Sequence, residues 1–249
     1  MKLARSRGRR YCHIVAFDDP ASIDVEALFR DGDMFESREA WSAAGFALIE
    51  RSSDGKIMVA RHPAVRGLLF KKYANTVGLS DQRENYASRV EGSRRLRSFV
   101  DAHHLSRVVV PRKWLLDLPR RFSRKATAHV LVVEQLDLRS DAQTKEAYRD
   151  IEPAVLADLC VVLYHFRGMD SIAKNLPFVA DGRIGLVDTE HWDRSSSKPY
   201  LHHVGGHMSS ARRSLAEKIF EQLEAAGDAW EVTRTFDGEE DTSSSSSSS

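Results

Sequence analysis

Residues 168–192 read GMDSIAKNLPFVADGRIGLVDTEHW. Asp170 is followed five residues later by Asn175, and Asp188 comes thirteen residues after Asn175. The pair Asp181-Gly182, between two apolar runs, is a strong signal for a hairpin turn. We therefore expect a strand, a turn and a second strand, with Asn175 and Asp188 together at the open end of the hairpin.

The three polar side chains of this stretch suit phosphoryl transfer. Magnesium prefers hard oxygen ligands, and those ligands must face the same phosphates as the base that orients the acceptor. The spacing resembles the catalytic loop and metal loop of the protein-kinase-like superfamily. The resemblance implies that Asp170 orients the acceptor hydroxyl and accepts its proton, and that Asn175 and Asp188 bind Mg²⁺. The alternative is that the three residues have only structural roles: Asp170 caps a turn, Asn175 sits in a loop, and Asp188 ends a strand.

The pattern between residues 46 and 73 predicts a three-stranded antiparallel meander. Residues 46–50, 56–60 and 68–73 read as strands, and the first two are joined by an Asp-Gly turn. A kinase N-terminal lobe opens in the same way, and the resemblance implies that Lys71 contacts the phosphates of ATP. Lys72 is the alternative, because adjacent strand residues point to opposite faces.

A helix is predicted over residues 81–104, where a capping box precedes apolar residues at helical spacing. The resemblance implies that this helix presents a glutamate that pairs with the strand lysine and holds that lysine on the phosphates. Glu91 lies twenty residues after Lys71, close to the interval of the family. A surface ion pair of Glu91 with Arg94 or Arg95 is the alternative.

Two further strands are predicted at residues 108–110 and 129–134 because both are rich in β-branched residues. With the meander they give a five-stranded antiparallel sheet. The resemblance implies that the strand at residues 129–134 leads into the linker between two lobes. Backbone groups of Glu134 to Leu136 in this linker would hydrogen-bond the adenine of ATP.

The C-terminal part is predicted to be mostly helical. Pro153 opens a helix with one apolar stripe, and a last helix runs from about residue 209 to 225. The cluster His202, His203 and His207 lies beside two glycines, and we interpret it as a loop, with a substrate contact or a zinc site as alternatives.

These elements give an α+β fold class and a minimal two-lobed, protein-kinase-like architecture. The predicted division is an N-terminal extension over residues 1–40, an N-lobe over 41–137, a reduced C-lobe over 138–228, and an acidic, serine-rich disordered tail over 229–249. The last seven residues are all serine, a low-complexity run that cannot build a core.

Composition restricts the classes of partner. The net charge of +1 gives no reason to expect nucleic acid. Two cysteines do not support a disulfide scaffold, and no run of about eighteen apolar residues is present. We therefore expect a monomeric, cytoplasmic protein without a membrane partner; export as an effector without a cleaved signal peptide stays open.

Several family motifs are replaced. Ser52-Ser53-Asp54-Gly55 stands where kinases have a glycine-rich loop, Gly168-Met169-Asp170 replaces His-Arg-Asp, and Asp188-Thr189-Glu190 replaces Asp-Phe-Gly. The chain is most similar to minimal kinases among bacterial effectors, which implies ATP and Mg²⁺ as cofactors and a protein substrate that accepts the γ-phosphate on a hydroxyl. The alternatives are an inactive pseudokinase binding module, a small-molecule kinase of the aminoglycoside or choline type, and an unrelated α+β protein.

Overall fold

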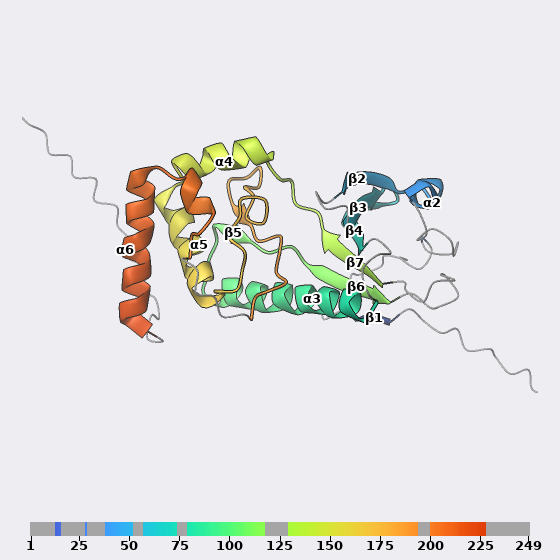
Figure 1. Cartoon of the computed structure of the whole chain (residues 1–249), viewed down its shortest axis with the longest axis horizontal. Coiled ribbons are helices and arrows are strands. Elements are labelled where there is room, and N and C mark those ends of the chain that lie inside the picture. The colour runs from blue at the N-terminus through green and yellow to red at the C-terminus, as the bar shows by residue number, and fades with distance from the viewer. Residues whose placement is uncertain are drawn as a thin grey trace, which may run out of the picture.

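The computed structural model describes residues 13–15, 28, 38–51, 57–73, 79–117, 129–193 and 200–227. The structure belongs to the α+β class, with an antiparallel sheet and several helices (Figure 1). Most of the predicted N-terminal extension, the turn over residues 52–56 and the serine-rich tail over 229–249 lie outside the described residues.

The main sheet has the strand order β1-β6-β7-β4-β3-β2, and each neighbouring pair is antiparallel. The predicted meander is confirmed, since β3 pairs with both β2 and β4. The bounds of the strands are β1 (His13–Val15), β2 (Ala47–Arg51), β3 (Ile57–His62), β4 (Val65–Tyr73), β6 (Lys113–Asp117) and β7 (His129–Glu134).

The predicted antiparallel sheet is present, but its strands differ from the prediction in two places. Residues 108–110 were expected in the main sheet, but β5 (Val108–Val109) pairs in parallel with β8 (Ile184–Gly185) in a separate two-stranded sheet. The position beside β7 is taken by β6 instead. Pro111, which has no N–H to continue a ladder, lies between the two runs and separates them. The sixth strand, β1, comes from a region with little periodicity in its sequence, and it was not predicted.

The two faces of the sheet carry different apolar clusters, as the two-residue period of a strand requires. One face packs Phe70 of β4 against Trp41 of α2 (Arg38–Ala43). The other face packs Leu69 and Tyr73 of β4 against α3 (Leu79–Ala102). Lys71, between Leu69 and Tyr73 in this alternation, therefore lies on the face that α3 covers.

A separate core joins the helical part to the far end of α3. This core packs Leu96 of α3 and Val108 of β5 against Leu159 of α5 and Ile219 of α6. In Figure 1, α3 extends from beneath the sheet toward the helical part, so it contacts both. The remaining helices are α4 (Asp141–Arg149), α5 (Pro153–His165), η2 (Val204–His207) and α6 (Ser210–Ala226).

The hairpin predicted around Asp181-Gly182 is present. Val179 N–H donates to Arg183 O at 2.8 Å, and Phe178 and Ile184 form an antiparallel bridge. Gly182 has a φ of +92°, in the left-handed region where glycine is favoured. At the open end, Val187 N–H donates to Asn175 O at 3.0 Å, which brings Asn175 next to the residue before Asp188.

Candidate functional site

Asp170, Asn175 and Asp188 come together at the open end of the hairpin. Asn175 Nδ2 lies 3.4 Å from Asp170 Oδ2, and the backbone of Asn175 pairs with Val187. α5 positions the loop, because it begins with Pro153 at its first turn and ends three residues before Gly168. The spacing in the sequence thus corresponds to real proximity in the fold.

The carboxyl group of Asp188 lies among cations from three elements. Burial would raise its pKa, but the charges of Arg89, Lys113 and Lys71, with the N–H of Glu190, outweigh burial and hold the pKa below its ordinary value. Arg89 Nε is 4.0 Å from Asp188 Oδ1, and the Asp188 side chain is 36% exposed. The Asp188 carboxylate is therefore ionised and partly exposed, and the charge of Lys71 on β4 is among those that act on it.

The position of Lys71 is fixed by α3 through a buried tyrosine. Tyr86 OH accepts from Tyr73 N–H at 2.7 Å and donates to Lys71 O at 3.2 Å, while the Tyr73 and Tyr86 rings stack with centroids 5.0 Å apart. These contacts hold the end of β4 against the helix. Lys72 is 3% exposed and lies on the opposite face of the strand, so the geometry favours Lys71 for any phosphate contact.

The helix presents an arginine, Arg89, toward Asp188. The guanidinium donates to Glu190 Oε2 through Nε at 3.2 Å and through Nη2 at 2.5 Å. Ser88 Oγ donates to Glu190 O at 2.6 Å, so two successive helix residues bind the same glutamate. We call residues 187–192 the Asp188 segment; α3 holds it through these bonds.

Glu91, the glutamate predicted to meet Lys71, lies in the ion pair that the sequence left as an alternative. Arg94 donates to both of its carboxylate oxygens at 2.9 and 2.6 Å, and Arg95 donates at 2.7 Å. Because the Arg94 hydrogen bonds and then those of Arg95 favour the charged form, the pKa of Glu91 falls to about 2. Both oxygens of Glu91 are thus engaged within α3.

A buried lysine contacts the residues on either side of Asp188. Lys113 of β6 is 6% exposed, and its Nζ donates to Val187 O at 2.9 Å and to Thr189 Oγ1 at 2.8 Å. Thr189 Oγ1 in turn donates to Arg89 O at 2.7 Å. Burial and the nearby charge of Lys71 lower the pKa of Lys113 well below its ordinary value.

The predicted adenine linker has one residue whose backbone groups are available. Glu134 N–H donates to Arg112 O, and Gln135 N–H donates to Gly67 O, at 2.9 and 2.8 Å. Among the hydrogen bonds of the described residues, none uses the N–H or C=O of Leu136. The side chain of Leu136 approaches Gly185, where an added Cβ would lie 3.1 Å from Leu136 Cδ1.

The hairpin end offers two oxygen atoms that could hold a magnesium ion together with phosphates. No group of three or more His, Cys, Asp or Glu side chains in the described ranges is arranged to hold a metal. Mg²⁺ needs fewer protein ligands, because one or two protein oxygens with water and phosphate complete its shell. Asp188 Oδ1 accepts from Glu190 N–H at 3.3 Å, whereas no described residue donates to Oδ2. Asn175 directs its amide nitrogen, Nδ2, toward Asp170. Its amide oxygen, Oδ1, therefore points away from Asp170.

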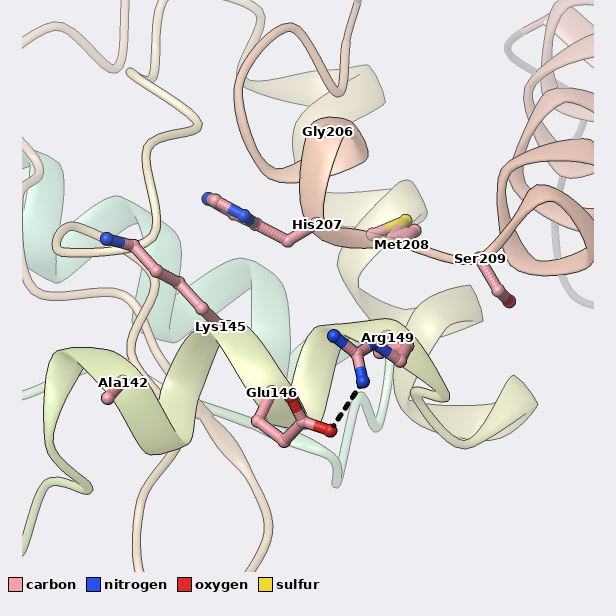
Figure 2. A pocket seen from close by; sticks show the side chains of 8 residues that line it. All are labelled: Ala142, Lys145, Glu146, Arg149, Gly206, His207, Met208 and Ser209. Atoms are coloured by element: carbon pink, nitrogen blue, oxygen red, sulfur yellow. Dashed lines mark hydrogen bonds and ion pairs between the residues drawn. The ribbon is translucent and has the colours of Figure 1, made fainter.

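The histidine cluster does not form one site. His203 Nε2 lies 3.8 Å from Asp170 Oδ1, and its loop is held to the Asp170 loop by Val204 N–H, which donates to Ser171 O at 3.0 Å. His207 instead lines a hollow of about 550 Å³ between α4 and η2. Figure 2 shows Lys145 extending toward His207 across this hollow, and Arg149 paired with Glu146.

Apart from His207, the hollow in Figure 2 is lined by none of the predicted site residues. Its charged side chains are balanced, since Lys145 pairs with Asp141 at 2.7 Å and Arg149 with Glu146 at 3.1 Å. The candidate site therefore remains the open end of the hairpin.

Sequence reasoning missed Arg89, Lys113 and Thr189. Helical periodicity could have found Arg89, because it lies three residues after Tyr86 and four before Ser93, on the buried face of α3. Lys113 gave a weaker signal as a cation directly before the apolar run of β6. For Thr189, only the contacts of the folded chain reveal a role.

Comparison with known proteins gives no identification. Within the described residues, no helix has the length and apolar character needed to cross a membrane. No protein family model matches the chain, and no curated protein matches it either.

Proposed function

We propose that this chain is an ATP-dependent phosphotransferase that moves the γ-phosphate of ATP to a hydroxyl group, most suitably on a protein. The observation that carries the proposal is that Asn175 lies beside Asp170 and pairs with the residue before Asp188, whose carboxylate is acted on by the charge of Lys71. Asp170 is 49% exposed, so a hydroxyl on a macromolecule can reach it.

Each of these residues has a defined task in the proposed reaction. Lys71 would bind phosphate oxygens, and the backbone of Leu136 would hydrogen-bond the adenine. Asp170 would orient the acceptor hydroxyl and take its proton as the bond to phosphorus forms. Asn175 and Asp188 would hold Mg²⁺, which neutralises phosphate charge when bound. The rate acceleration would come from positioning and charge stabilisation.

The proposed architecture has two lobes. The sheet with the first half of α3 would be the N-lobe, and α4, α5, α6 and the hairpin would form the reduced C-lobe. The predicted boundary after residue 137 needs one refinement, because Leu96 and Val108 belong to the core of the helical part.

A pseudokinase is the second candidate, and the contacts of α3 favour it. An arginine occupies the helix position facing Asp188, and Glu91 is bound to Arg94 and Arg95. Because Glu91 is bound to two arginines of its own helix, a site that binds nucleotide without turnover would serve as a protein-binding module. The small-molecule kinase alternative rests on the pattern Asp188-x-Glu190, but Glu190 is bound to Arg89.

The test is Mg²⁺-dependent transfer of labelled γ-phosphate from ATP, with purified chain alone and with a cell lysate. Asp170→Asn and Asp188→Asn should each abolish labelling. Asp181→Asn is the matched control, because Asp181 lies in the turn of the same hairpin and should label as the wild type does. Nucleotide binding without labelling in any sample would support the pseudokinase instead.

A further inference from the structure

Lys113 is a buried cation whose hydrogen bonds go to the two neighbours of Asp188. The ammonium group donates to Val187 O before Asp188 and to Thr189 Oγ1 after it, and the side chain is 6% exposed. Thr189 is fully buried, and its hydroxyl donates in turn to the backbone carbonyl of Arg89. A chain of hydrogen bonds thus runs from β6, past Asp188, to α3.

Stability alone does not account for a lysine at this position. Removing an ammonium group from water costs several kcal/mol, and apolar residues of similar volume often replace buried ionic groups without loss of stability. The neighbouring position on the same face of β6, Leu115, is apolar and packs in the cluster facing α3.

The geometry explains what the ammonium adds. The carbonyl before Asp188 and the side chain after it bind one nitrogen, so the backbone on both sides of Asp188 is fixed. Its carboxylate is then restricted to rotation about its own side-chain bonds.

We propose that Lys113 is a positioning residue that holds Asp188 in the orientation needed to bind a divalent metal together with ATP. This inference rests on the proposed function, because it assumes that Asp188 is a metal ligand. Lys113 contacts neither the nucleotide nor the acceptor in this scheme; it acts through Val187 and Thr189.

The experiment measures Mn²⁺ binding by electron paramagnetic resonance in the presence of ATP, together with thermal unfolding. For Lys113→Met we expect the Mn²⁺ dissociation constant to rise about tenfold or more, as is typical when a residue that orients a metal ligand is removed. The melting temperature should fall, because Val187 O and Thr189 Oγ1 lose their donor, so binding is compared at a temperature where both proteins are folded. Lys145→Met, an exposed lysine on α4, is the control and should change neither quantity.

Unchanged Mn²⁺ affinity in Lys113→Met would overturn the proposal, whether or not the melting temperature falls. If Lys113→Met does not fold, Thr189→Val tests the same contact, because it removes the hydroxyl that accepts from Nζ at similar volume. Weaker Mn²⁺ binding in Thr189→Val supports the proposal, and unchanged binding overturns it.

The two proposals fail in different ways. A wild-type chain that binds Mn²⁺ with ATP but transfers no phosphate contradicts the proposed function, while the comparison with Lys113→Met still decides the role of Lys113. A wild-type chain that binds no Mn²⁺ with ATP overturns both.

Discussion

Gly92 marks the closest approach of the Asp188 segment to α3. A Cβ at this position would overlap the carbonyl oxygen of Thr189 and lie 2.6 Å from Trp192 Cδ1. Because carbon atoms in contact lie about 3.5–4.0 Å apart, the change Gly92→Ala requires the segment to move by about 1 Å. The movement would strain the bond from Ser88 Oγ to Glu190 O.

Three contributions set the expected size of the effect. Alanine is favoured over glycine inside a helix by about 1 kcal/mol. Overpacking costs about 1–3 kcal/mol, and a weakened hydrogen bond costs about 1 kcal/mol. We therefore expect Gly92→Ala to lower the free energy of unfolding by about 1–3 kcal/mol, although helix propensity alone predicts a gain.

Urea unfolding followed by circular dichroism measures this difference. Ala87→Gly, at an exposed position of the same helix, calibrates propensity and should lose about 1 kcal/mol. If Gly92→Ala is instead more stable than the wild type by a similar amount, the Asp188 segment does not pack on α3 as described.

Three other predictions concern the lysine strand and α3. Lys71→Met should lower kcat/KM for phosphate transfer at least about tenfold, since a charged hydrogen bond is worth about 1.5–3 kcal/mol; an equal loss of kcat/KM in the folded fraction of Lys72→Met would contradict the assignment. Tyr86→Phe leaves the buried Tyr73 N–H and Lys71 O without their partner and should cost about 1–3 kcal/mol in urea unfolding; an unchanged midpoint would show that these bonds do not hold β4. The folded-state pKa of Glu91, about 2, lies below its ordinary 4.5, so its ion pairs stabilise above pH 4.5 and are lost as the pH falls through 2. Glu91→Gln should therefore be less stable than the wild type at pH 7 and equal to it near pH 2; a difference that does not shrink as the pH falls would contradict the pairing.

Local turn chemistry and strand periodicity made part of the fold predictable. The hairpin around Asp181-Gly182 was confirmed because a turn with a glycine at positive φ leaves a local sequence signature. The meander was confirmed for the same kind of reason. α4 was missed although its capping box, Ser140 with Gln143, is also local.

Strand partners could not be predicted locally. The runs 108–110 and 113–117 are both short and rich in apolar residues, and only tertiary pairing decides which joins the main sheet. Leu115 pairs with Leu131 of β7, whereas Val108 pairs with Ile184 of the hairpin. Both pairings join residues far apart in the sequence.

The candidate site was predictable where spacing along the chain dictates proximity. Asp170 and Asn175 lie on one loop, and the hairpin returns the chain to Asp188. The helix partner was harder to predict, because the family interval pointed to Glu91 whereas the buried face of α3 carries Arg89. Lys113 depends on the packing of β6 against the Asp188 segment, which no local pattern encodes.

The most direct test of the central claim compares two labels on ATP. The purified chain is incubated with Mg²⁺ and a cell lysate, using either γ-labelled or α-labelled ATP, and each sample is repeated with Asp188→Asn. We predict that γ-label alone reaches an acceptor and only with the wild-type chain. Transfer of α-label, or γ-label transfer that survives in Asp188→Asn, would contradict the claim that this site is a phosphotransferase centre.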